Sequence, residues 1–113
     1  KGLKSILELI ANSGEGSPLA VLKLFGKQNR NYLSFPMEGY TLALDFKNTP
    51  KIHNLLNELD SIVNDNNGRI YLAKDSRIKT QSFKNGYQAF QSFKNKLENQ
   101  KSIRSLQSNR LFK

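Results

Sequence analysis

The sequence predicts an α+β domain with a ferredoxin-like antiparallel sheet whose helices lie on one face. Helical periodicity at both ends of the chain, apolar strand-like segments between them, and the order helix, strand, strand, helix, strand, helix predict this class. The order matches a β-α-β-β-α-β unit without its first strand, so we expect that strand to be missing from this fragment. The absence of a methionine at Lys1 also leads us to expect sequence upstream.

The first predicted elements are a helix and a strand. A helix over residues 3–12 is predicted by apolar side chains at i, i+3, i+4 and i+7, namely Leu3, Ile6, Leu7 and Ile10. A strand over residues 18–25 follows, because this apolar segment is interrupted only by Lys23. Polar residues then predict a loop over residues 26–34.

A second strand is predicted over residues 40–46, where large apolar side chains alternate with small or polar ones. The large set, predicted to face the core, is Tyr40, Leu42, Leu44 and Phe46. The other face carries Thr41, Ala43 and Asp45. We expect this second face to be turned toward any site.

The second half begins with a helix whose start is marked by Thr49 and Pro50 and whose end is marked by Gly68. A short strand is predicted over residues 69–73, and then one helix with the apolar stripe Phe83, Tyr87, Phe90, Phe93 and Leu97. No clear period follows Gln100. We therefore divide the chain into a domain over residues 1–98 and a basic C-terminal tail over residues 99–113.

The formal net charge of +9 comes almost wholly from the C-terminal part of the chain. Residues 1–73 hold 8 Lys and Arg against 7 Asp and Glu, whereas residues 74–113 hold 10 against 2. Such a basic segment can bind nucleic acid, anionic lipid or a phosphorylated substrate. Our first interpretation is a solvated surface, with a peripheral membrane contact as a further possibility.

Several kinds of chemistry find no support in the sequence. The chain has no cysteine and one histidine, His53, which predicts no thiol chemistry, no metal site and no Ser/His/Asp triad. Its seven glycines never form a phosphate-binding loop, so we expect no binding of FAD or ATP by this chain alone. With no apolar run of membrane-spanning length, we expect a soluble protein, either cytoplasmic or peripheral at a membrane.

Two lysines occupy positions where a charge is costly. Lys23 interrupts an apolar strand, and Lys74 follows the predicted strand over residues 69–73. The simpler interpretation is that both extend their ammonium groups to solvent from a sheet edge. The functional interpretation is that they enter one polar pocket beside Thr41 and Asp45.

Four segments resemble the C-terminal part of FAD-linked sugar oxidases of the vanillyl-alcohol-oxidase type. These flavoproteins include the aldonolactone oxidases and oxidases of polyprenyl-phosphate-linked ribose. The resemblance extends from about residue 3 to residue 98, and Arg104, Ser105, Ser108, Arg110 and Leu111 are similar to the family's ending. The four segments are residues 21–26, 33–40, 44–46 and 68–77.

The resemblance implies a substrate domain that covers the flavin, with FAD bound mainly by an N-terminal domain outside this chain. By residue match, Lys23 and Lys74 correspond to the pocket lysines and Tyr71 to a tyrosine against the flavin. Thr41 and Ala43 stand where the best-known member has asparagine and cysteine, which leaves the substrate open among sugars, sugar lactones and polyprenyl-phosphate sugars. No catalytic residue is singled out.

The sequence also supports a structural requirement for the site and an alternative function. Tyr71 and Lys74 are three residues apart, so a regular strand would send their side chains to opposite faces, and a shared site needs a bulge or a strand end near Ala73. The alternative function is a small basic nucleic-acid-binding domain, suggested by the charge and by seven Phe and four Tyr. We expect no specific nucleic-acid partner, because those aromatic residues fall mostly on predicted core faces.

Overall fold

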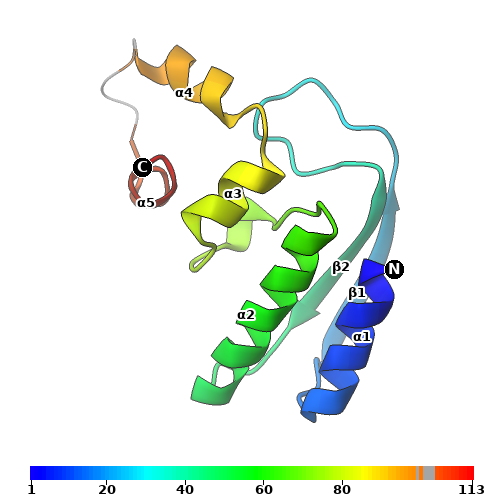
Figure 1. Ribbon diagram of the computed structural model, residues 1–113. Helices are drawn as coiled ribbons and strands as arrows, with labels where there is room; N and C mark the ends of the chain where they lie inside the picture. The colour runs from blue at the N-terminus through cyan, green and yellow to red at the C-terminus, as the bar shows by residue number, and fades with distance from the viewer. Residues whose placement is uncertain (99, 101–103) are drawn as a thin grey trace.

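A computed structural model describes residues 1–98, 100 and 104–113 (Figure 1). The described residues form α-helices, a two-stranded sheet and one short 3₁₀-helix, η1. In chain order the elements are α1 (Gly2–Ser13), β1 (Leu19–Phe25), β2 (Gly39–Asp45), α2 (Pro50–Asp65), η1 (Leu72–Lys74), α3 (Thr80–Gly86), α4 (Phe90–Glu98) and α5 (Leu106–Leu111).

The predicted α+β class is confirmed, with a small sheet. β1 and β2 pair antiparallel over their whole length, from Leu19 opposite Asp45 to Phe25 opposite Gly39. Figure 1 shows α1 and α2 in front of this hairpin, with the shorter helices α3, α4 and α5 gathered beyond one end of α2. The ferredoxin-like arrangement needs more strands than the described residues supply, and it stays a prediction.

The helix α2 begins where the sequence places it. The Thr49 hydroxyl accepts a hydrogen bond from the Ile52 amide at 3.3 Å, and Pro50 occupies the first turn. The helix ends before Asn67, which adopts a left-handed conformation with φ of 53°. Local capping chemistry therefore sets both ends of this element.

Two apolar clusters form the interior. The helix cluster joins α2 to α1 and to the end of β2; its buried members are Ile52, Leu55 and Leu59, and its partly buried members include Ile6, Leu9, Ile10 and Phe46. The aromatic cluster lies among the C-terminal elements; its buried members are Ile78, Phe83, Tyr87, Phe90 and Leu111, and Leu33, Phe35, Ile70, Leu72 and Phe112 pack against it. The main aromatic packing thus lies away from the sheet.

The strand predicted over residues 69–73 is wrong. Residues 69–71 are irregular, and the chain then turns into η1. Side chains take up the carbonyls that a strand would offer to a neighbour: the Tyr87 hydroxyl donates to the Ile70 carbonyl at 2.7 Å, and Gln107 donates to the Leu72 carbonyl at 2.8 Å. The apolar residues of this segment enter the aromatic cluster instead of a sheet.

The single C-terminal helix predicted to carry the stripe from Phe83 to Leu97 is also wrong, because the chain breaks between α3 and α4. The break at residues 87–89 lets Phe83 and Phe90 pack edge to face with ring centroids 4.9 Å apart. In a continuous helix, residues 83 and 90 would share a face but would lie about two turns apart along the helix axis. The stripe is apolar because its side chains belong to the core, but these side chains are carried by two short helices, α3 and α4.

The described part of the predicted tail is packed against the domain. Residues 104–113 include α5, which is capped by reciprocal hydrogen bonds between Ser105 and Ser108. Leu111 is 1% exposed within the aromatic cluster, whereas Arg104 and Lys113 are exposed, so this part has an apolar contact with the domain and keeps basic groups at the surface. Residues 99 and 101–103 of the predicted tail lie outside the described part of the chain.

The face of β2 predicted to be core is only partly covered. Leu42, Leu44 and Phe46 are half-buried, but Tyr40 is 65% exposed. Tyr40 lies opposite Leu24, which is 70% exposed. Burial on this face therefore falls toward the end of the hairpin where these two residues lie.

Candidate functional site

The hairpin register brings three of the predicted substrate-binding residues to one face. Lys23 lies directly opposite Thr41, and Ala43 lies opposite Val21, which is two positions from Lys23. Directly opposed residues of an antiparallel pair share a face, and so do residues two apart. Lys23 and Ala43 are exposed and Thr41 is half-buried, so this face is open beside the lysine.

Tyr71 and Lys74 lie on the η1 turn, and this geometry removes the difficulty posed by their spacing. Tyr71 caps the N-terminus of η1 and Lys74 ends it. Tyr71 itself is extended and η1 follows it directly, so the strict side-to-side alternation of a strand does not govern this pair. A shared site for Tyr71 and Lys74 stays a prediction.

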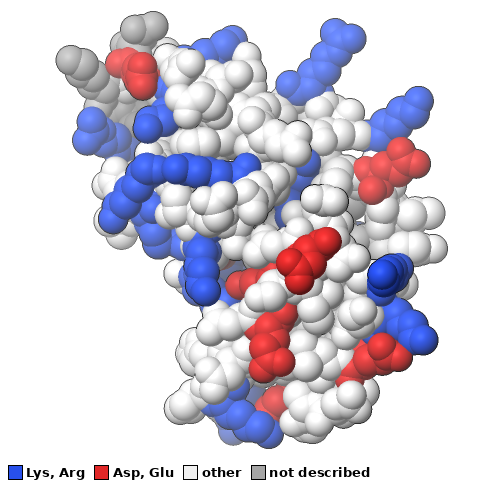
Figure 2. All heavy atoms as spheres, viewed as in Figure 1, with Lys and Arg blue, Asp and Glu red and all other residues white. Residues whose placement is uncertain are grey.

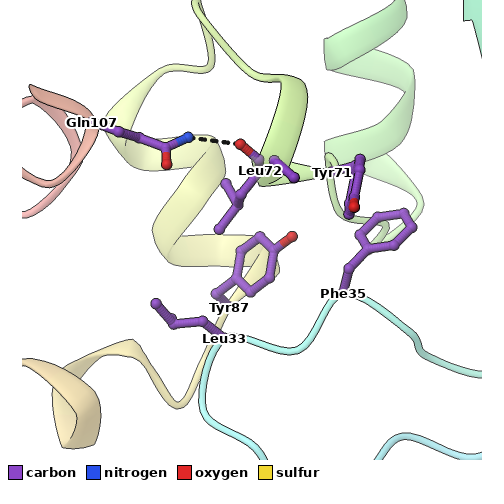
Figure 3. A pocket seen from close by; sticks show the side chains of 7 residues that line it. Leu33, Phe35, Tyr71, Leu72, Tyr87 and Gln107 are labelled. Atoms are coloured by element: carbon purple, nitrogen blue, oxygen red, sulfur yellow. Dashed lines mark hydrogen bonds between the residues drawn. The ribbon is translucent and has the colours of Figure 1, made fainter. Parts of the chain in front are cut away.

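A chain of aromatic rings connects the hairpin to this turn. Phe25, at the end of β1 and on the same face as Lys23, packs edge to face against Phe35 with ring centroids 6.1 Å apart. The ring centroids of Phe35 and Tyr71 are 5.1 Å apart, and Figure 3 shows the two side chains beside each other. Phe35 is thus the physical link between two groups of predicted site residues that are distant in sequence.

The two lysines themselves are not joined. Among the described residues neither ammonium group bonds to a protein acceptor that could bring Lys23 and Lys74 together, and both side chains are exposed. Their entry into one pocket therefore stays a prediction. What the fold supplies is a continuous path from the face of Lys23 to the turn of Lys74 through Phe25, Phe35 and Tyr71.

Beside Tyr71 lies a pocket of about 280 Å³. Its walls come from the loop before β2, from η1, from the end of α3 and from α5, as Figure 3 shows. The lining residues are Leu33, Phe35, Tyr71, Leu72, Ala73, Tyr87 and Gln107. Burial raises the pKa of Tyr87 to about 12, so its hydroxyl stays protonated and keeps donating to the Ile70 carbonyl at neutral pH.

Arg69 holds the long loop between β1 and β2 next to the site. Its guanidinium donates to the Ser34 carbonyl at 2.7 Å and to the Gln28 side chain at 3.2 Å, and it lies over the Tyr87 ring at 5.2 Å. Sequence reasoning did not single out Arg69, Phe35 or Gln107. The only local signal was the position of Phe35 and Arg69 inside segments that carry the family resemblance.

Asp75 fixes the chain immediately after Lys74. Its carboxylate accepts hydrogen bonds from the amides of Arg77 and Ile78 and pairs with Arg110, and its side chain is 3% exposed. Burial alone would raise the pKa of Asp75, but the bonds from Ile78, Arg110 and Arg77 outweigh it and hold the pKa below its usual value. The neighbouring Arg77 pairs with Asp60 on α2 at 2.8 Å.

We expect Asp75→Asn to lower the free energy of unfolding by about 2 kcal/mol at pH 7, because a charge-assisted buried contact is lost. A lowered folded-state pKa means that the carboxylate stabilises the fold above its unfolded pKa, and that this stabilisation is lost as pH falls through the folded value. The difference between wild type and variant should therefore shrink below about pH 4. Urea unfolding at several pH values checks this, with the exposed Asp65→Asn as the control; a pH-independent difference would contradict it.

Charge is unevenly distributed over the face seen in Figure 2. Acidic side chains gather mainly over α1 and α2, whereas basic side chains are spread over the whole face, including the part formed by the C-terminal helices. Within the described residues no cluster of His, Cys, Asp and Glu could hold a metal ion. In the same part of the chain, every helix is too short or too polar to cross a bilayer.

Comparison with known proteins finds similarity to a segment of an oxidase. Over 80 residues, or 71% of this chain, the sequence is 44% identical to decaprenylphosphoryl-beta-D-ribose oxidase of Mycolicibacterium smegmatis. Over 78 residues, or 68% of the chain, it is 35% identical to a Streptomyces coelicolor protein called the uncharacterized protein in mprA 5'region. No model of a known protein family matches the chain.

The matches cover 17% of the first relative and 21% of the second, so the chain spans about a fifth of the curated relatives it matches. The similarity expected from residues 3–98 is therefore supported at the level of a segment. On this basis the chain is similar to one part of an oxidase.

Proposed function

We propose that this chain is the substrate-side part of an FAD-dependent oxidoreductase that oxidises a sugar, a sugar lactone or a polyprenyl-phosphate-linked sugar at an alcohol group. The observation that carries the proposal is the 44% identity over 80 residues to a protein named as an oxidase of a decaprenylphosphoryl ribose. The arrangement of Lys23, Thr41, Tyr71 and Lys74 around one aromatic chain supports it.

The residues of this chain suit one side of a flavin-binding pocket, but they do not form a site that would enclose the phosphates of the cofactor. Tyr71 is 51% exposed and presents a ring that could lie along a flat cofactor, and two exposed lysines flank the same path. The scattered glycines offer no loop for a pyrophosphate. FAD, bound mainly by an N-terminal domain outside this chain, would supply the hydride acceptor.

The side chains of this chain would then bind and orient the substrate. The ammonium groups of Lys23 and Lys74 are donors to sugar hydroxyl or phosphate oxygens, and they offer positive charge where negative charge develops during oxidation. The Thr41 hydroxyl can donate and accept beside Lys23. Ala43 leaves room on the same face and offers no thiol.

The basic nucleic-acid-binding domain is the alternative function, favoured by the excess of lysine and arginine in residues 74–113. Three of the aromatic rings that would be needed to stack on bases, those of Phe83, Tyr87 and Phe90, are buried in the aromatic cluster. The basic surface is equally suited to a peripheral contact with anionic lipid or to a phosphorylated substrate. We favour the oxidoreductase.

The test is flavin reduction by the whole protein that contains this chain. We expect the purified protein to retain FAD and its flavin absorbance to bleach anaerobically when a sugar, a sugar lactone or a polyprenyl-phosphate-linked sugar is added. We expect the 113-residue chain alone to retain no FAD in equilibrium dialysis. A whole protein without flavin, or stoichiometric FAD on the chain alone, would contradict the proposal, and nanomolar sequence-specific nucleic-acid binding would favour the alternative.

A further inference from the structure

We propose that Gln107 is a positioning residue for Tyr71 and Lys74, acting by holding the η1 turn against α5. The proposal makes the C-terminal helix part of the site, although Gln107 itself is not assigned any contact with substrate. Its consequence for oxidation rests on the proposed function, whereas the positioning itself can be measured without it.

The contact between α5 and η1 is made at the carbonyl of Leu72. The Gln107 side-chain amide donates to the Leu72 carbonyl at 2.8 Å, and the backbone amide of Asp75 donates to the same oxygen at 3.2 Å. The second of these bonds closes the η1 turn. Gln107 therefore binds the acceptor on which the turn depends, as the dashed line in Figure 3 shows.

Tyr71 and Lys74 depend on the turn because their own side chains are weakly held. Within the described residues neither side chain donates or accepts a hydrogen bond, and the aromatic partner of the half-exposed Tyr71 ring is Phe35. A single 3₁₀ turn has poorer hydrogen-bond geometry than an α-helix. Contacts with other elements must therefore hold the η1 turn in place, and the hydrogen bond from Gln107 to the Leu72 carbonyl is one of them.

The helix α5 is itself firmly placed, so it can serve as a support. Arg110 donates to the Ile78 carbonyl at 2.6 Å and pairs with Asp75, and Leu111 is buried in the aromatic cluster. The capping bonds of Ser105 and Ser108 fix the first turn, next to Gln107. Contacts from α5 thus hold the segment 72–78 at Leu72, at Asp75 and at Ile78.

The first test compares Gln107→Met with Gln91→Met in the 113-residue chain. Methionine keeps the length of the side chain and removes the donor, and among the described residues the Gln91 side chain bonds only to Asn95, within α4. We expect hydrogen exchange at the Asp75 amide to become about fivefold faster or more in Gln107→Met, with the Phe83 and Tyr87 amides unchanged. Equal acceleration at all amides, or none at Asp75, would overturn the proposal.

The second test uses double-mutant cycles on flavin reduction in the whole protein. If Gln107 acts through the turn that carries Lys74, Gln107→Met should slow reduction severalfold, and the loss should be smaller once Lys74→Met is present. When Gln107→Met is combined instead with Lys23→Met, the two losses of rate should multiply, because Lys23 lies on β1 and not on the turn. Additivity in both cycles would overturn the positioning role. If the wild-type protein reduces no flavin, the proposed function is wrong, and the exchange comparison still decides whether Gln107 holds the turn.

Discussion

Replacing Phe83 by alanine is expected to lower the free energy of unfolding by about 3–5 kcal/mol. Phe83 is 0% exposed, and its ring lies against those of Tyr87, Phe90 and Phe112 at centroid distances of 5.4, 4.9 and 5.9 Å. Truncation leaves a ring-sized cavity among groups that three separate elements position. Since small domains are stable by about 5–15 kcal/mol in total, this change removes a large part of the stability.

Urea unfolding followed by far-ultraviolet circular dichroism measures the effect. Phe83→Leu keeps most of the volume and should cost about 1–2 kcal/mol, so it remains measurable even if the alanine variant does not fold. Phe46→Ala, in the half-buried part of the helix cluster, is the matched control outside the aromatic cluster. A cost for Phe83→Ala no larger than that for Phe46→Ala would show that the aromatic cluster is not the main source of stability.

The elements predicted well from the sequence are those specified by local chemistry. The helix α2 follows from Thr49, Pro50 and a helical apolar period, and the hairpin follows from an apolar segment and an alternating one. In each case the bonds that define the element join residues close in the chain or in a regular register. The α+β class follows from these elements alone.

The elements predicted wrongly are those decided by distant side chains. Residues 69–73 have the composition of a strand, but Tyr87 and Gln107 take two of the carbonyls that a strand would use. Gln107 lies 35 residues from Leu72, so no local pattern could reveal the bond. The same holds for α5, which is short and is fixed by Arg110 and Leu111 against elements far upstream.

The candidate site shows the same division. Lys23 and Thr41 are placed in one pocket by the functional interpretation of the sequence, and the structure puts them directly opposite each other in the hairpin. Phe35 could not be assigned a role, since a loop residue gives no periodic signal, yet its ring connects Phe25 to Tyr71. The difficulty with the spacing of Tyr71 and Lys74 came from assuming a strand, and the turn η1 removes it.

Lys23 and Lys74 are expected to act in the whole protein that contains this chain. Lys23→Met and Lys74→Met should each lower the rate of flavin reduction by roughly tenfold to a thousandfold, because a charge-assisted contact made as negative charge develops is lost. Folding should be unaffected, since both side chains are exposed and methionine retains most of the apolar stem. Stopped-flow reduction under anaerobic conditions gives the rate, and thermal unfolding reports on the fold.

Lys4→Met is the matched control, because Lys4 is an exposed lysine on α1 that pairs with Glu8 one turn away at 3.6 Å. The rate of flavin reduction in Lys4→Met should stay within a factor of two of the wild-type rate, since exposed ion pairs of this kind contribute little. Full rates in both the Lys23 and Lys74 variants would make them ordinary surface lysines. A loss confined to Lys23→Met would instead limit the site to the hairpin face with Thr41 and Ala43, and would separate the η1 turn from substrate binding.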